Sequence, residues 1–145
     1  MSANLDLVRS IYADWERGDY SSTEWAHPEI ELVVPDGPAP GRWIGLAGMR
    51  EGFRDSLRVW DDFRSEAEEY RELDGQHVLV LVRPRARGRA SGVDLEAMWG
   101  IQQRGANVFR VRAAKVTRLV VYFMSEPALA DLGLAAETSR GQSKG

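Results

Sequence analysis

The chain has 145 residues, 19 basic and 22 acidic side chains and a formal net charge of -3, which fits one globular domain with no general attraction to nucleic acid. It has no cysteine and only two histidines, which excludes a disulfide framework and a thiolate nucleophile, and we expect no metal site. No apolar run approaches the roughly 20 residues of a membrane span, and the N-terminus lacks an export signal. We therefore expect a cytoplasmic protein with no nucleic-acid partner and no membrane partner.

The chain opens with a pattern typical of an amphipathic helix. Asn4 is placed to cap it and Gly18 to end it. Its apolar residues recur at steps of three and four and are Leu5, Val8, Ile11, Tyr12 and Trp15. A short second helix is predicted to follow Ser21 or Ser22 and to stop before His27-Pro28, because the residue before proline avoids the helical region.

A short strand over Glu29–Val34 leads into a loop that three prolines stiffen. Asp36 is the only ionisable residue in that loop, and without other information it is more readily interpreted as a turn cap than as a catalytic group. A second helix face follows, which we expect to lie on the sheet. Its apolar residues are Met49, Phe53, Leu57 and Trp60.

Two strands, Phe63–Leu73 and Gln76–Arg85, are predicted to form a hairpin around Asp74-Gly75. This turn would set Glu66 opposite Arg83 and make the arginine run the partner of an acidic strand, not a nucleic-acid patch. Pro84 lacks a backbone donor, which indicates an edge position.

The longest strand pattern, Val93 to Phe123, carries a polar residue on its apolar face. Asn107, Phe109 and Val111 alternate and so share one side, where a polar group needs a partner or a ligand. The connection between the two arms, residues 112–115, lacks Asn-Gly, so we expect a longer loop based on a type I turn. These patterns predict a sheet that closes over a cavity.

The returning arm is apolar on both faces, although one helix layer can cover only one of them. We therefore predict a homodimer, with either Val120 and Tyr122 or the opposite set of Leu119, Val121 and Phe123 at the subunit contact. After it, Pro127–Leu132 is predicted to form a last helical turn that Gly133 ends. Residues 1–134 then make one domain, and residues 135–145 form a disordered tail.

Four segments together resemble the SnoaL-like group of the nuclear transport factor 2 and ketosteroid isomerase superfamily. They are Leu7–Asp19, Gly45–Phe53, Lys115–Phe123 and Ala128–Leu134. The resemblance implies an α+β, cone-shaped, cystatin-like fold, in which a curved and mainly antiparallel sheet wraps around the N-terminal helices. It also implies an apolar pocket at the open end and, commonly, a homodimer. Isomerases, cyclases and non-catalytic members share this fold, so the fold alone selects no function.

The resemblance also suggests roles for single residues. Asp36 lies nine residues before Gly45, as the general-base aspartate of ketosteroid isomerases does, and Asn107 takes the place of their second, protonated aspartate. The position of their oxyanion tyrosine holds Ile11, with Tyr12 one step away and about 100° around the helix. The tyrosine therefore has no equivalent in this prediction, which argues against steroid isomerisation.

Two hypotheses follow from these roles. In the first, the chain is a cofactor-independent acid-base enzyme, an isomerase or cyclase acting on a small apolar carbonyl compound, with Asp36 as base and Asn107 as hydrogen-bond donor. In the second it is a non-catalytic ligand-binding or dimerisation module. In both, we expect aromatic side chains to contact the ligand. They are Tyr12, Trp15, Trp43, Phe53, Trp60 and Phe109.

Overall fold

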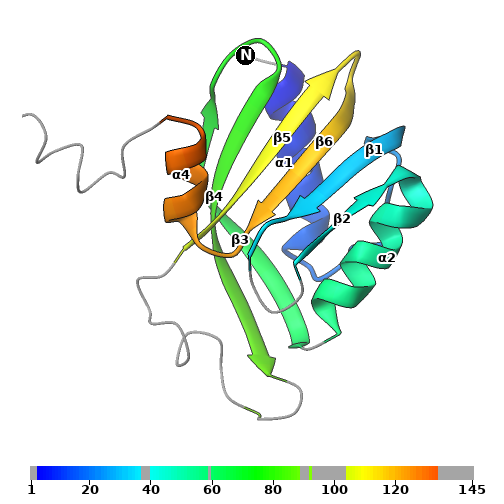
Figure 1. Ribbon diagram of the computed structural model, residues 1–145, viewed down its shortest axis with the longest axis vertical. Coiled ribbons are helices and arrows are strands. Elements are labelled where there is room, and N and C mark those ends of the chain that lie inside the picture. Colours follow the sequence, from blue (N-terminus) through cyan, green and yellow to red (C-terminus); the bar gives the residue numbers. More distant parts are fainter. Residues whose placement is uncertain (1–2, 37–39, 59, 89–91, 93–103, 134–145) are drawn as a thin grey trace, which may run out of the picture.

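The computed structural model describes residues 3–36, 40–58, 60–88, 92 and 104–133, and is built on one six-stranded sheet of order β2-β1-β6-β5-β4-β3 (Figure 1). Neighbouring strands are antiparallel except β1 and β6, which are parallel. The predicted α+β class with a curved, mainly antiparallel sheet is confirmed. In chain order the elements are α1 (Ala3–Trp15), β1 (Ala26–Val34), β2 (Gly41–Ile44), α2 (Gly45–Leu57), β3 (Trp60–Glu72), β4 (His77–Gly88), β5 (Gly105–Arg112), β6 (Lys115–Tyr122) and α4 (Ser125–Asp131).

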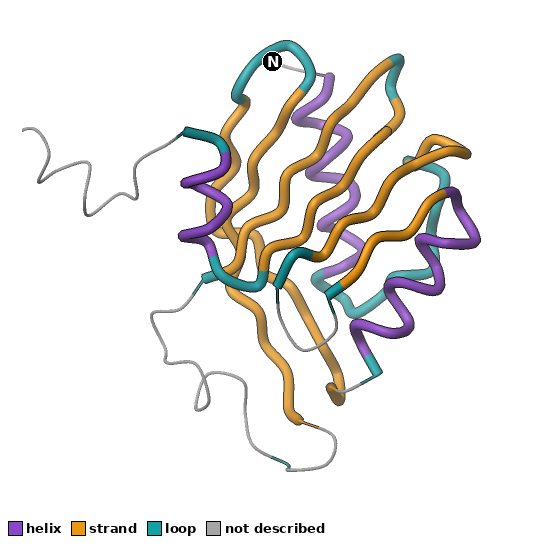
Figure 2. Tube along the Cα trace, in the orientation of Figure 1, coloured by secondary structure: helices purple, strands orange, loops and turns teal. Residues whose placement is uncertain are grey.

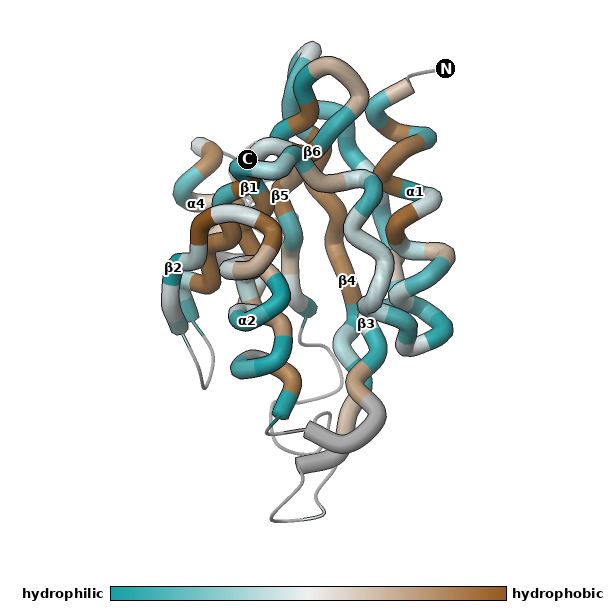
Figure 3. Tube along the Cα trace, turned by 90° about the vertical axis from the view of Figure 1, so that its right-hand side faces the viewer, coloured by the Kyte–Doolittle hydropathy of each residue, from teal (hydrophilic) through white to brown (hydrophobic). Residues whose placement is uncertain are grey.

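Helices lie against both faces of the sheet (Figure 2). On the inner face, Val80 of β4 belongs to the larger core together with the buried stripe of α1. On the outer face, Leu79 and Leu81 of the same strand belong to a second cluster with Ala128 of α4. Both faces of β4 are therefore buried from Val78 to Val82, which explains the hydrophobic stretch that this strand shows in Figure 3.

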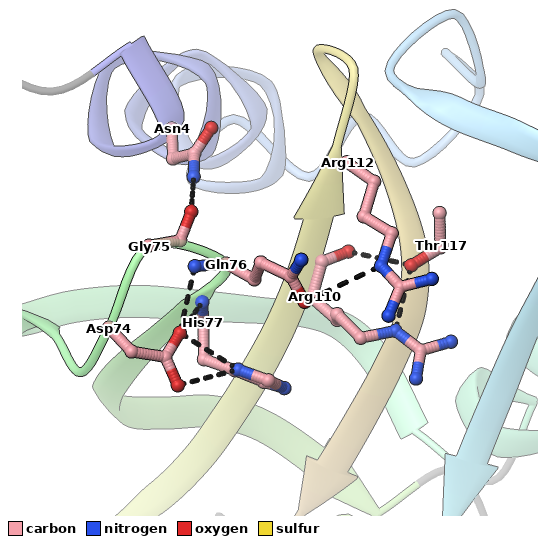
Figure 4. A network of polar contacts seen from close by, with 8 residues as sticks. All are labelled: Asn4, Asp74, Gly75, Gln76, His77, Arg110, Arg112 and Thr117. Carbon is pink, nitrogen blue, oxygen red and sulfur yellow. Dashed lines mark hydrogen bonds and ion pairs between the residues drawn. The ribbon is translucent and has the colours of Figure 1, made fainter.

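Helix α1 buries the predicted stripe, and Gly18, with φ of +81°, follows its end in a turn. Asn4, however, lies inside the helix, and its amide donates to the carbonyl of Gly75 at 3.0 Å (Figure 4). The predicted capping role is therefore wrong. The asparagine instead fastens the start of α1 to the β3–β4 turn.

The predicted helix after Ser21 is absent, and residues 19–23 form neither helix nor strand. The backbone N–H and the hydroxyl of Ser21 both donate to the Asp19 carboxylate, at 3.0 and 2.7 Å. This local side-chain turn replaces the helical bonds, a known competition for serine and aspartate. His27 and Pro28 then belong to β1, which begins earlier than predicted.

Helix α2 ends at Leu57, and Trp60 is the first residue of β3. The prediction that Trp60 continues the apolar face of the helix is therefore wrong. Its spacing of three residues from Leu57 is coincidental, since an aromatic residue also suits the start of a strand.

The β3–β4 turn is longer than predicted, because the N–H of Leu73 donates to the carbonyl of His77 at 2.9 Å. Inside the turn, the Asp74 carboxylate accepts the backbone N–H groups of Gln76 and His77, at 2.7 and 2.8 Å (Figure 4). These bonds, first that from Gln76, lower the pKa of Asp74 from its ordinary value. The turn is thus held by its own first residue.

Glu66 does lie opposite Arg83, as predicted. A bulge after Ala67 compensates for the longer turn and restores the register. The ion pairs run along the diagonals, from Arg83 to Glu68 at 2.9 Å and from Arg85 to Glu66 at 3.0 Å. Partnership of the arginine run with the acidic strand is therefore confirmed for these two arginines.

Pro84 is not on an edge strand, because β4 lies between β3 and β5. The pairing of β4 with β5 ends at Val82 and Gly105, so within the described residues Pro84 has a strand partner only on the β3 side, opposite Ser65. The missing donor of proline is tolerated at this local edge.

The β5–β6 connection is a two-residue turn, because Arg112 pairs directly with Lys115. Ala113 and Ala114 both have positive φ, 50° and 66°, as a primed turn requires. The prediction of a longer loop is therefore wrong. The pairing of the two strands imposes the turn, although left-handed backbone costs an alanine roughly 1–2 kcal/mol.

Val120 and Tyr122, one of the two sets predicted for a subunit contact, lie in the outer cluster with α4 and are buried within one chain. Residues 93–103, predicted to begin the long strand, and residues 135–145, predicted to form a tail, lie outside the described residues. In the described part of the chain, no helix has the length and apolarity needed to cross a membrane. The same residues contain no group of three or more side chains suited to hold a metal ion.

Candidate functional site

An apolar pocket lies between the inner face of the sheet, the end of α1 and helix α2. Its space measures about 630 Å³, open solvent at its mouth included. None of the lining residues is charged at neutral pH. They are Trp15, Tyr20, Leu32, Val34, Phe53, Leu57, Phe63, Ser65, Val82, Pro84, Gly105, Asn107, Val121, Tyr122 and Phe123.

Asn107 lies on β5 and lines the pocket, with only 4% of its surface exposed. The alternation argument for its inward position is confirmed. Its Nδ2 donates to the hydroxyl of Tyr12 on α1, a side chain that is fully buried behind the pocket wall. Burial raises the pKa of Tyr12 well above its ordinary value, so the phenol stays protonated at neutral pH.

The two helix residues compared in the sequence, Ile11 and Tyr12, make different contacts in the structure. Ile11, the residue in the position expected from the resemblance, is buried in the same core as an apolar side chain. Tyr12, the next residue, brings its hydroxyl to Asn107. Neither residue lines the pocket, so the absence of an oxyanion tyrosine stays a prediction.

Asp36 lies beside the pocket but is not among its lining residues. One carboxylate oxygen accepts the N–H of Phe123 at 2.8 Å, and the other accepts the N–H of Met124 at 3.1 Å. Met124 is the N-cap residue of α4. The aspartate therefore connects the segment after β1 to the junction of β6 and α4, and both of its oxygens already have partners.

The predicted aromatic residues occupy two layers. Trp15 and Phe53 line the pocket, with ring centroids 5.9 Å apart in an edge contact. Tyr12 and Phe109 lie behind Trp15 and are fully buried, with Phe109 6.0 Å from the Trp15 ring. The second pair supports the first and does not line the pocket.

Trp43 is not a lining residue either. Its ring lies against α2, so close that a Cβ built on Gly52 would be 2.7 Å from it and one on Gly41 would be 2.6 Å from it. The tryptophan thus fills the contact between β2 and α2. The backbone of Trp60 opens β3, and its side chain lies outside what the structure describes.

Ser65 on β3 is a lining residue that was not predicted, and it is 6% exposed. No hydrogen-bond partner of its hydroxyl is found in the described parts of the chain. The alternation of Phe63, Ser65 and Ala67 carries the same signal that identified Asn107, a polar residue at a period of two among apolar ones.

A sequence model of the SnoaL-like domain matches residues 8–119. Among solved structures, an NTF2-like protein of unknown function from Burkholderia pseudomallei K96243 is 19% identical, with a TM-score of 0.72 over 90% of this chain and 97% of that one. TerC, co-crystallised with polyporic acid, is 23% identical, with a TM-score of 0.69 over 90% of this chain and 98% of that one.

A Xanthomonas campestris protein of unknown function with a cystatin-like fold is 17% identical, with a TM-score of 0.68 over 90% of this chain and 96% of that one. At these identities the likeness establishes the fold alone. A comparison with curated proteins gives no match.

Proposed function

The chain belongs to the SnoaL-like domain family, and from that premise we propose that it binds a small, neutral, largely apolar molecule in the pocket without a cofactor. The observation that carries this proposal is the lining itself. Its walls are mostly apolar and aromatic, no ionised side chain contributes, and two buried polar side chains, Ser65 and Asn107, face the space. This composition is typical of sites that take up apolar ligands and orient them with a few polar groups. TerC, which has the same fold, has been co-crystallised with polyporic acid.

The test is a thermal-shift screen of apolar ketones and lactones, followed by calorimetric titration. A ligand at 100 times its dissociation constant adds about 2.7 kcal/mol to the free energy of unfolding. Val121→Phe places a larger side chain in the pocket and should abolish the shift. Val33→Phe is the matched control, because Val33 packs with the outer cluster. Equal shifts in both variants would contradict binding in this pocket.

Acid-base catalysis is a second candidate, favoured by the position of Asp36 beside Phe123, which lines the pocket. For Asp36 to act as base, one of its oxygens would have to leave a backbone N–H and turn toward the ligand. Once a ketone or lactone is found to bind, its isomerisation or ring closure is followed by NMR with the wild type and Asp36→Asn. Catalysis through this carboxylate predicts a loss of at least about 100-fold. Full turnover in the variant would leave the aspartate as a structural residue.

We also propose a homodimer through the outer side of the sheet. The supporting observation is that Ile44 on the outermost strand β2 is 57% exposed. It pairs with Glu31 of β1 and lies on the same face of the sheet as partly buried Val33, two residues further along β1. Light scattering should then give twice the mass of one chain. A mass of 16.2 kDa at micromolar concentration would contradict the dimer.

A further inference from the structure

The contact between Tyr12 and Asn107 leaves hydrogen-bonding groups without partners. Nδ2 of Asn107 lies against the Tyr12 hydroxyl, and neither side chain has another polar partner among the described residues. In this arrangement the hydroxyl hydrogen of Tyr12 finds no acceptor, and the amide oxygen of Asn107 finds no donor. Both groups are buried, so both lose their water without compensation.

A rotation of the amide by 180° removes both deficits at once. The oxygen and the nitrogen of an asparagine are nearly equal in size, so the exchange leaves the packing unchanged. The phenol of Tyr12, which stays protonated, then donates to Oδ1 of Asn107. The NH₂ group turns toward the pocket, where a ligand can meet its hydrogens.

We infer that Tyr12 holds the Asn107 amide in this rotated orientation, so that the pocket selects ligands that present an acceptor oxygen, such as the carbonyl of a ketone or lactone. Tyr12 is then a positioning residue, because it acts through Asn107 and does not line the pocket. The inference rests on the proposed function and specifies which polar group the ligand carries.

The hydroxyl groups that line the pocket do not impose this choice. The Ser65 hydroxyl rotates freely and is able to donate or accept. The hydroxyl of Tyr20 already donates to the carbonyl of Phe63 at 3.1 Å, and that of Tyr122 donates to Asp131 at 2.7 Å. Trp15 also lines the pocket, and its indole N–H only donates. A variant that acts on the Asn107 amide alone is therefore needed to assign the selection to Asn107.

Three planar tricyclic molecules of nearly the same shape distinguish a pocket that selects acceptor groups from one that selects donor groups or neither. Fluorene is apolar, fluorenone adds one acceptor oxygen and carbazole adds one N–H donor. Their dissociation constants are measured by calorimetric titration of the full chain. We expect wild type to bind fluorenone roughly fivefold to tenfold more tightly than fluorene, the gain of one net hydrogen bond, and carbazole no more tightly than fluorene.

Tyr12→Phe frees the amide to rotate. The variant should reduce the preference for fluorenone over fluorene to less than about twofold. It should also let carbazole bind more tightly than it binds to wild type, because the amide oxygen is then able to face the pocket. Tyr70→Phe is the matched control. The Tyr70 ring meets the Tyr12 ring edge-on, with centroids 6.0 Å apart, and Tyr70 is not a lining residue. Removing its hydroxyl should therefore leave the preference for fluorenone over fluorene unchanged.

The relative dissociation constants of the three probes for wild type also test the inference, without any variant. A preference for carbazole over fluorenone, equal binding of all three probes, or a fluorenone preference that survives Tyr12→Phe would each overturn it. If all three bind equally, the proposed function stands and only the orientation of the amide is wrong. If none binds, the inference fails for ligands of this size, and the thermal-shift screen decides the proposed function separately.

Discussion

Asp36 and Asn107, the two residues predicted to act together, lie in regions that use their polar groups in opposite ways. At the junction of β1, β6 and α4, both oxygens of Asp36 accept backbone N–H groups. In the pocket wall, Asn107 shares one hydrogen bond with Tyr12 and keeps further bonding capacity. The first arrangement completes the backbone bonding of the fold, whereas the second leaves a polar group available to a ligand.

The same distinction separates two of the three tryptophans predicted to bind a ligand. Trp43 is enclosed by β2 and glycines of α2, while Trp15 forms part of the pocket wall. Residue type alone therefore does not identify a binding residue. A better guide to a binding residue is whether the fold leaves its hydrogen-bonding groups or its surface without contacts.

The largest effect is expected at Asp36. Asp36→Asn replaces one acceptor oxygen by an NH₂ group that faces a backbone donor, which should lower the free energy of unfolding by about 2 kcal/mol. Urea denaturation measures it. Asp55→Asn on α2, whose carboxylate has no partner in the described ranges, is the control and should change stability by less than about 0.5 kcal/mol. If both variants unfold alike, Asp36 is not a structural link.

The next effect is expected where Trp43 meets α2. A Cβ at Gly52 would lie 2.7 Å from both Leu32 and the Trp43 ring, so Gly52→Ala should destabilise by about 1–2 kcal/mol despite the higher helix propensity of alanine. At Gly48 the nearest atom would be 3.4 Å away. Gly48→Ala should therefore be neutral or stabilising by up to about 1 kcal/mol. The midpoint temperatures of thermal unfolding of the two variants test this difference. A Gly52→Ala variant more stable than wild type would contradict the tight packing of Trp43.

More of the fold than of the candidate site could be predicted from the sequence. Period-two alternation placed Asn107 on the inner face, since a strand with one covered side fixes the side of every residue. Local signals failed where tertiary contacts dominate, as at Ala113 and Ala114, where strand pairing imposes a turn that alanine disfavours. The role of Asp36 could not be predicted because its partners, Phe123 and Met124, are distant in sequence.

The β5–β6 turn offers a smaller effect, far from the pocket. Replacing Ala113-Ala114 by Asn-Gly supplies residues that tolerate positive φ, so we expect a gain of about 1 kcal/mol in the free energy of unfolding. Binding of fluorenone should be unaffected, because neither alanine lines the pocket. A loss of stability in urea denaturation would show that the turn does not require left-handed backbone.

The smallest effect is expected at the β3–β4 turn. The pKa of Asp74 is lowered in the folded chain, first by the backbone N–H of Gln76, so its contribution to stability is present above the unfolded value of about 3.9. That contribution is lost as the pH falls through the folded pKa. Stability measured by urea denaturation should therefore decrease more steeply below about pH 4 in wild type than in Asp74→Asn. Parallel profiles would contradict this role.

The most direct test of the contrast between Asp36 and Asn107 is the dissociation constant of fluorenone for Asp36→Asn and for Asn107→Leu, compared with wild type at the same temperature and pH. We predict that Asn107→Leu weakens binding by roughly fivefold to tenfold, because the amide donor is lost. Asp36→Asn should stay within about twofold of wild type, because the carboxylate serves the fold and not the ligand. The reverse result, with weakened binding in Asp36→Asn and unchanged binding in Asn107→Leu, would contradict the account.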